Sequence, residues 1–388
     1  MSIGSSAWRI RCLCAATLVV VWSARGQNSD GYWDYPGGGS WANSGNWDSG
    51  TIADGEDSTA YFGLSLFATI PANATFTLDG ARTIGDIEFL ATTGPDNWAL
   101  NTGSGGPLTL DNTFNPPPIN VSFASQTVTI NAVLAGTNGM EKLGSGTLIL
   151  SATNSYSGET IVSAGALRVN GVIGFDAVTV AGSAMLGGTG IITSPVTIQS
   201  GGSLTPGSLP GRLTISNSLT LQSGCTTIMK VNALTLAHDF VSGMSALNYS
   251  GNLIVSNLAG TPALGQSFQL FSAASYSGNF SSLSPQPTGG ARWRFDPAGG
   301  VLSVVSTASQ PWISAASLSS GNLVLQVVNG APGVTNYLLS STNLTLPMTA
   351  WTRLATNIFD ISGKLYVTNL VNFNTTQRFF GVSVPIGP

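Results

Sequence analysis

Charged residues are scarce in this sequence, and so are cysteine and histidine. Only 8% of the 388 residues are charged, against roughly a quarter in an average soluble protein. The formal net charge is −4, so the chain lacks the basic surface that nucleic-acid binding needs, and no nucleic-acid partner is expected. The single histidine, His238, excludes metal sites and proton relays that are built from several histidines.

The amino-terminal residues predict a secretion signal. Arg9 and Arg11 precede an apolar stretch over residues 12–22, which is shorter than the roughly 20 residues that a membrane-spanning helix needs. Small residues before position 27 favour cleavage after Gly26, so residues 1–26 are predicted to be a signal peptide. We therefore expect a secreted or cell-surface protein, exported by this signal, with no transmembrane segment after cleavage.

Cleavage would leave one cysteine in the exported chain. Cys12 and Cys14 lie inside the predicted signal, and Cys225 follows it. No internal disulfide can form from one thiol. Cys225 lies in a strand-rich segment and is predicted to be a small buried residue rather than a reactive thiol.

What the sequence does contain is a repeat of 18 residues. Thr160–Val162 returns as Val178–Val180 and again as Val196–Ile198. A fixed period of this kind is typical of a solenoid, in which each coil buries its apolar side only by stacking on the next. A second apolar pair follows each strand: Ala166–Leu167, Met185–Leu186 and Ser203–Leu204.

The composition favours β-structure throughout. Hydrophobic residues make up 43% of the chain, glycine occurs 48 times, and no long apolar stretch has a helical period. Gly165, Gly182, Gly201 and Gly202 fall between the paired strands, where a corner needs positive φ. The predicted fold class is all-β: a right-handed parallel β-helix followed by a small C-terminal β-sandwich.

The sequence predicts five consecutive segments. These are the signal peptide (1–26), an aromatic-rich N-terminal cap with the first coils (27–82), the parallel β-helix (83–232), a distal cap or β layer (233–305) and a C-terminal β-sandwich module (312–388).

One stretch of the core resembles a known family. Residues 146–169, GTLILSATNSYSGETIVSAGALRV, resemble the autotransporter-associated β-strand repeat of secreted passenger domains. Residues 200–207 and 40–47 are similar to further segments of such chains. The resemblance implies export, a β-helix and a passenger-type surface protein. It implies no catalytic residue and no cofactor.

Parallel β-helices can also host polysaccharide lyases and hydrolases, which gather acids and a basic residue on one face. Glu141, Glu159 and Asp176 are the only acids of the regular core. Glu159 and Asp176 are one residue short of the repeat, which leaves their proximity open. The basic residues show no registry, and solvated corner charges are the favoured interpretation: Lys142, Arg168, Arg212 and Lys230.

Three further groups invite a chemical interpretation. His238–Asp239 could be a general base with its acid, Asp54–Asp57 with Asp48 could bind Ca²⁺, and the indoles of Trp33, Trp41 and Trp47 could stack on sugar rings. A turn histidine, a solvated turn and an aromatic cap are favoured instead. No catalytic, cofactor-binding or metal-ligating residue is assigned.

The predicted function is that of an exported, non-enzymatic structural or adhesin-like β-helix protein at the cell surface or outside the cell. Its expected partners are extracellular polysaccharide or cell-envelope material. The alternative is a carbohydrate-active β-helix enzyme, a polysaccharide lyase or hydrolase, or a carbohydrate-binding module. A groove with two acids and a basic residue within hydrogen-bond reach would favour the enzyme.

Overall fold

A computed structural model describes most of the chain after the predicted signal. The signal peptide, residues 1–26, lies outside the described residues. No helix in the described part is long and apolar enough to cross a membrane. The described residues are 28–63, 70–90, 96–113, 116–207, 210–307, 311–319, 322–330, 332–370 and 377–383.

The chain divides into two compact units. The first comprises the residues up to Gly146 together with 154–158, and the second comprises 147–153 with the residues from Glu159 onward. Within the described residues both units consist of strands and turns, apart from short 3-10 helices. These are Ser44–Asn46, Asp48–Gly50 and Met348–Ala350.

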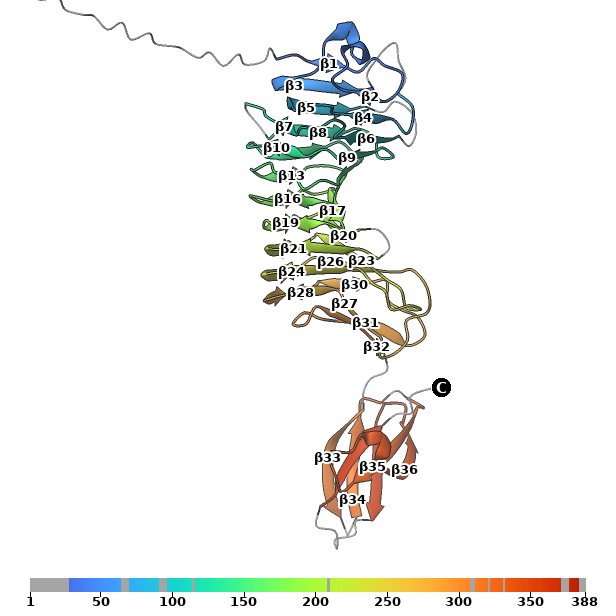
Figure 1. Cartoon of the computed structure of the whole chain (residues 1–388). Coiled ribbons are helices and arrows are strands. Elements are labelled where there is room, and N and C mark those ends of the chain that lie inside the picture. The colour runs from blue at the N-terminus through green and yellow to red at the C-terminus, as the bar shows by residue number, and fades with distance from the viewer. Residues whose placement is uncertain are drawn as a thin grey trace, which may run out of the picture. The chain divides into compact units, whose positions relative to one another are not determined.

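Two parallel sheets form the first unit (Figure 1). One contains β1 (Gly31–Tyr32), β3 (Gly55–Phe62), β5 (Arg82–Phe89), β8 (Pro118–Val121) and β11 (Met140–Leu143), with β7 (Leu108–Leu110) and β10 (Leu134–Gly136) pairing beside β5. The other contains β2 (Gly39–Ser40), β4 (Thr75–Thr77), β6 (Asn97–Asn101) and β9 (Thr127–Ile130).

Three parallel sheets form the β-helix of the second unit, and each coil contributes one strand to each sheet over most of its length. The first is β13 (Thr160–Val162), β16 (Val178–Val180), β19 (Val196–Ile198), β22 (Ser218–Leu221), β25 (Ala246–Tyr249) and β29 (Tyr276–Gly278). The second is β12 (Thr147–Leu150), β14 (Ala166–Val169), β17 (Met185–Gly188), β20 (Ser203–Pro206), β23 (Thr226–Val231), β26 (Asn252–Asn257) and β30 (Ser282–Ser284). The third is β15 (Val172–Ile173), β18 (Ile191–Ile192), β21 (Arg212–Ile215), β24 (Phe240–Met244) and β28 (Phe271–Ala273).

The register of the first sheet follows the 18-residue repeat from β13 to β19. Thr160 pairs with Val178, and Val178 pairs with Val196. In the neighbouring sheet Leu186 pairs with Leu204, and both side chains are fully buried. Successive coils therefore stack equivalent buried positions on one another. A shift of one residue would turn every buried side chain outward, so this register is strongly favoured.

The corners keep the same period but use a different set of residues from the one predicted. Positive φ recurs at Gly165 (62°), Ser183 (71°) and Gly201 (82°). Gly182 and Gly202 do not adopt it. A Cβ at either of these two would lie 2.9 Å from a backbone oxygen of a neighbouring coil, so their glycines permit close backbone approach instead.

Parallel pairing continues beyond the regular core. β26 pairs with β30, and β25 pairs with β29. A three-stranded antiparallel sheet then follows, ordered β27 (Ser267–Gln269), β32 (Val301–Ser306) and β31 (Ala291–Asp296). Longer loops interrupt the sequence period here without breaking the strand pairing. The boundaries of the five segments given in the sequence analysis remain predictions.

The C-terminal residues form two antiparallel sheets of three strands. One is ordered β33 (Trp312–Ser319), β34 (Asn322–Val328) and β37 (Leu365–Leu370), and the other β36 (Thr352–Ile358), β35 (Thr335–Ser341) and β38 (Phe379–Ser383). Leu325, Leu338 and Val367 are the buried centre between them. The predicted class, a parallel β-helix with a small C-terminal β-sandwich, is confirmed.

Candidate functional site

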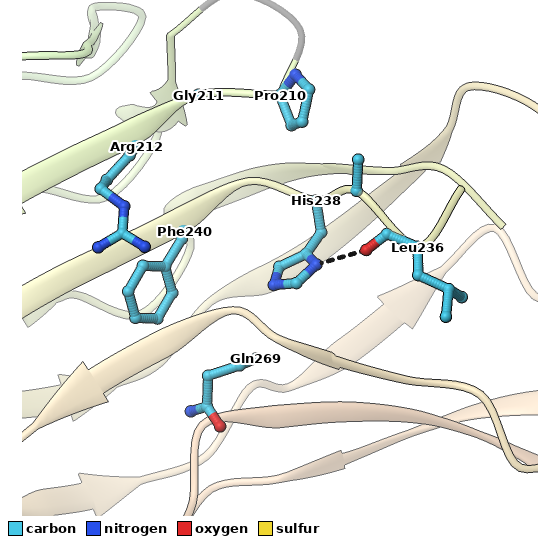
Figure 2. Close-up of a pocket in the computed structure, with 8 residues that line it drawn as sticks. Pro210, Gly211, Arg212, Leu236, His238, Phe240 and Gln269 are labelled. Carbon is cyan, nitrogen blue, oxygen red and sulfur yellow. Dashed lines mark hydrogen bonds between the residues drawn. The ribbon is translucent and has the colours of Figure 1, made fainter. Parts of the chain in front are cut away.

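A groove of about 550 Å³ lies on the third sheet of the β-helix, in the second unit (Figure 2). β21 and β24 provide one side, the loop before β24 provides another, and β27 contributes one residue at the rim. Its lining combines one cationic, one imidazole and several apolar side chains: Pro210, Gly211, Arg212, Leu236, Ala237, His238, Phe240 and Gln269.

The loop over residues 232–238 is fixed by its own hydrogen bonds. The Asn232 side-chain oxygen accepts from the backbone N–H groups of Leu234 and Thr235, both at 3.0 Å. The Asn232 N–H donates to the Ala237 carbonyl at 2.7 Å. An asparagine that caps its own loop in this way is a common turn device. Here it holds Leu236, at a positive φ of 62°, beside the groove.

A buried ion pair ties two walls of the groove together. The fully buried Asp239 carboxylate accepts from the Gly211 N–H at 2.6 Å and the Lys230 N–H at 2.8 Å. The Lys230 ammonium lies 2.7 Å from it and donates to the Pro206 carbonyl at 2.7 Å. With its charge paired and its oxygens bonded, Asp239 acts as a structural anchor.

His238 does not share this network with Asp239. Neighbouring residues of an extended segment point to opposite sides. His238 Nδ1 lies 2.9 Å from the Leu236 carbonyl oxygen, as the dashed line in Figure 2 shows. A carbonyl can only accept, so Nδ1 carries the proton and Nε2 of the neutral ring is an acceptor. Phe268 supports the ring at a centroid distance of 5.8 Å. Asp239 therefore cannot act as the acid that orients His238, and the hypothesis of a histidine–aspartate general base is not supported.

Arg212 is the groove's free cation. Its guanidinium lies over the Phe240 ring, 4.6 Å from the centroid, a cation–π contact. It makes no ion pair or hydrogen bond with any residue that the structure describes. At the rim, Gln269 is held by donating to the Phe271 and Gly299 carbonyls at 2.5 and 2.6 Å.

The core acids are placed separately. The Glu159 carboxylate accepts from the Thr179 hydroxyl at 2.6 Å, while Asp176 is exposed on a turn. The Thr160–Val178 pairing leaves Asp176 one residue out of register with Glu159. Across the described ranges, no group of three or more histidine, cysteine or acidic residues could hold a metal ion.

In the first unit, Lys142 is buried beside Glu141. Its ammonium donates to the Leu143 and Gly144 carbonyls at 2.5 and 2.9 Å. Burial lowers the pKa of Lys142 to about 8. This lysine therefore faces the interior rather than the solvated corner that was predicted for it.

The acids proposed as calcium ligands have separate protein partners. Asp54 pairs with Arg82 at 2.8 Å and accepts from the Thr83 N–H at 3.0 Å. Asp57 accepts from the Thr113 hydroxyl at 2.6 Å and its N–H at 2.7 Å, which lowers the pKa of Asp57. These bonds hold the turn together.

The three tryptophans are buried and cannot stack on a sugar. Trp33 and Trp41 are fully buried and Trp47 is 3% exposed. The ring centroids of Phe62 and Trp41 are 5.3 Å apart, and those of Phe76 and Trp33 are 5.0 Å apart. Each indole N–H donates to a backbone carbonyl at 3.1 Å or less. The sugar-stacking alternative is therefore wrong for these residues.

Cys225 is fully buried, and its Sγ lies 3.8 Å from the Ser250 carbonyl oxygen. Burial raises the pKa of the Cys225 thiol. A buried thiol with a raised pKa is a poor nucleophile.

Comparison with known proteins identifies a family match within the repeat region. The family described as Passenger-associated-transport-repeat matches residues 140–169. The chain contains a passenger-type repeat. It is also 34% identical over 171 residues, 40% of its length, to the Adhesin BmaC autotransporter of Brucella suis biovar 1 (strain 1330). That match spans 5% of the relative's length.

The passenger-type repeat confirms the predicted resemblance. In the second unit it supplies β12, β13 and β14, whose buried residues are leucine, valine and Thr160. The groove begins at Pro210, well beyond the repeat's last residue. The family match thus accounts for the coil and leaves the groove unassigned.

Sequence reasoning also missed a pair of acids in the first unit. Asp86 and Glu88 lie two residues apart on β5 and so share one face. Desolvation, then the charge of Glu88, raises the pKa of Asp86 to about 7. One Asp86 oxygen is buried without a hydrogen-bond partner. Glu88 accepts from Asn120 at 2.6 Å. An Asp-x-Glu pattern inside a strand was the available signal.

Proposed function

We propose that this protein is a non-enzymatic, adhesin-like β-helix protein that acts at the cell surface or outside the cell. The passenger-type repeat at residues 140–169 is the observation that carries the proposal. The matched relative is named as an adhesin, and the predicted signal peptide supports export. Extracellular polysaccharide or cell-envelope material is the proposed partner.

The construction of the coils supports a presenting role. Inward positions form stacked columns of buried valine, leucine and isoleucine. Along one sheet the outward positions line up as Thr179, Thr197, Thr220 and Asn248. Continuous backbone pairing along such columns resists bending, since each coil is fixed by two neighbours. The coils would hold binding loops at set positions outside the cell.

The surroundings of Glu159 and Asp239 support a non-enzymatic role for the β-helix of the second unit. Glu159 is bonded to Thr179, and Asp239 is neutralised by Lys230. General acid–base chemistry on a polysaccharide needs a carboxylate placed to reach substrate. Neither acid meets that condition.

Adhesion assays on the exported chain would test the proposal. Purified residues 27–388 would be applied to cells, to isolated cell envelopes and to an array of extracellular polysaccharides, and release of shortened sugar products would be followed in parallel. Binding without cleavage is expected. Cleavage of any polysaccharide would overturn the non-enzymatic assignment, and absence of binding throughout would remove the adhesin role.

One observation favours the alternative, a carbohydrate-active enzyme. Asp86 and Glu88 are two carboxyl groups on one strand face, and a carboxyl with a pKa of about 7 is suited to act as a general acid. If cleavage is found, the Asp86→Asn and Glu88→Gln variants should abolish it. Cleavage that survives both changes would exclude this pair.

A further inference from the structure

We propose that the groove around Arg212 and His238 binds a carboxylate-bearing sugar residue, a uronate, of an extracellular polysaccharide. The inference rests on the proposed adhesin-like function, because it names the ligand class that such a protein would recognise. Nothing in the family match covers this groove, which lies outside the passenger-type repeat.

Arg212 provides the recognition of the carboxylate. Its guanidinium rests over the Phe240 ring at 4.6 Å, so the planar group has a fixed support. Its N–H groups are not used by the described residues. A guanidinium held in this way can donate two parallel hydrogen bonds to one carboxylate.

His238 provides an acceptor for a sugar hydroxyl. Its Nδ1–H donates to the Leu236 carbonyl at 2.9 Å, and Phe268 supports the ring. The opposite nitrogen, Nε2, is therefore an acceptor in the neutral ring. Figure 2 shows Arg212, Phe240 and His238 side by side along the groove. A uronate has hydroxyl groups beside its carboxylate and can meet both residues.

The remaining lining suits a sugar ring better than an acidic side chain of a peptide. Pro210, Phe240 and the half-exposed Leu236 offer apolar surface to the C–H face of a pyranose. The volume of about 550 Å³ falls in the range of small-molecule sites. The carboxyl group of a single aspartate or glutamate would leave most of it unfilled.

The charge around the groove suits one carboxylate at a time. Among the lining residues Arg212 is the one permanent cation. Lys230 is already paired with Asp239 at 2.7 Å. One uronate per binding event is what the site can neutralise.

The groove is also held ready before a ligand arrives. Asp239 joins Gly211, on the wall that leads to Arg212, with Lys230 on the neighbouring sheet. Binding therefore does not have to order these segments, which lowers its entropic cost.

Calorimetric titration of the exported chain, residues 27–388, with trigalacturonic acid and with its methyl ester would test the inference. The acid should bind, and the uncharged ester should bind at least about tenfold more weakly, since hydrogen bonds to a charged group are the stronger ones. Arg212→Gln should weaken binding of the acid about ten- to a hundredfold. Arg212→Lys keeps the positive charge but loses the two parallel N–H donors of the guanidinium. Its affinity for the acid should lie between that of the parent chain and that of Arg212→Gln.

Arg168→Gln is the matched control, because Arg168 is a half-exposed arginine on the outer face of β14. It should leave the affinity unchanged. Far-ultraviolet circular dichroism and the melting temperature would verify that each variant is folded. Equal binding of acid and ester, or no binding of either, would overturn the inference. An unchanged affinity in Arg212→Gln, or tighter binding of a tri-glutamate peptide, would also overturn it.

The two proposals fail separately. Cell-envelope binding by a chain that does not bind trigalacturonic acid would leave the adhesin-like function standing and remove the uronate site. Binding of trigalacturonic acid through Arg212 by a chain that adheres to no envelope or polysaccharide surface would do the opposite.

Discussion

Two stretches of the same β-helix show how a repeat becomes a site. Between β13 and β19 the strands of the first sheet recur every 18 residues, with Thr160 level with Val178 and Val178 level with Val196. After β19 the coils lengthen, because Val196 pairs with Leu219 and Leu219 pairs with Leu247. Pairing is kept while the added residues leave the coil as loops. The groove is lined by residues of this lengthened stretch.

The two stretches also treat charge differently. In the regular coils acids stay at corners, as exposed Asp176 does. In the lengthened stretch Asp239 is fully buried and paired with Lys230. Long loops need an anchor that apolar columns do not provide, and a buried pair with further hydrogen bonds can supply one. Departures from the repeat, rather than the repeat itself, therefore bring charged and polar side chains together in this β-helix.

The largest expected effect comes from removing the buried acid. Asp239→Ala would leave Lys230 without its counter-charge and two backbone N–H groups without their acceptor. We expect the free energy of unfolding to fall by about 3–5 kcal/mol in urea denaturation. Asp176→Ala, on the regular coil, should change it by less than about 0.5 kcal/mol. Similar losses in both would remove the contrast between the stretches.

The regular coils should be most sensitive at their buried columns. Leu186 is fully buried and stacked between Leu167 and Leu204. Leu186→Ala should lower the free energy of unfolding by about 2–4 kcal/mol, through lost burial and the cavity that remains. Its neighbour Met185 is only half-buried on the outer face, so Met185→Ala should cost clearly less. Equal losses of unfolding free energy in the two variants would show that the buried leucine column does not contribute more to stability than the outer face.

A pH effect extends the comparison to the irregular coils of the first unit. The folded-state pKa of Asp86 is raised to about 7, above an unfolded value of about 3.9. Between those values the folded chain keeps a proton that the unfolded chain has lost. Stability therefore falls as pH rises from about 4 to about 7, and stays lower above it.

The variant Asp86→Asn should remove this pH dependence. Its gain over the parent chain should approach about 1–2 kcal/mol at pH 8, after allowance for solvent screening, and should vanish near pH 4. Thermal melts at the two pH values would measure it, with exposed Asp48→Asn as the control. A gain of the same size at pH 4 would refute the assignment to Asp86.

The smallest effects should come from the corners. Gly201 has a φ of 82°, so Gly201→Ala should cost about 1 kcal/mol. Ser183 occupies the same corner one coil earlier, with a φ of 71°. Ser183→Gly should change stability by a few tenths of a kcal/mol, because relief at positive φ offsets the greater freedom of the unfolded chain. Differential scanning calorimetry would measure both stability changes. A larger change in Ser183→Gly than in Gly201→Ala would contradict the idea that both residues occupy the same kind of corner.

Much of the fold could be predicted because solenoid order is local. Each coil contacts mainly its neighbours, so the period that sets Thr160 level with Val178 is already present in the sequence. The strand Trp312–Ser319 was not predicted, since its residues do not alternate clearly between apolar and polar. The corner residue Ser183 was missed because the adjacent glycine was the stronger signal.

The candidate site could not be predicted, because its parts lie on different coils. Arg212 meets Phe240 only through pairing of β21 with β24. His238 obtains its tautomer from a carbonyl in its own loop, and its orientation from Phe268. Neither relation has a sequence period. In the same way, Trp41 could have faced a ligand or a core until Phe62 was placed beside it.

The sequence by itself determined the all-β class, the 18-residue register and the passenger-type repeat, because these depend on spacing between neighbouring coils. The tertiary structure decided which tryptophans are buried, which acids are paired and that Arg212 has no hydrogen-bond or ion-pair partner among the described residues. Burial and pairing depend on groups from distant parts of the chain, and only folding brings those groups within hydrogen-bond distance of one another.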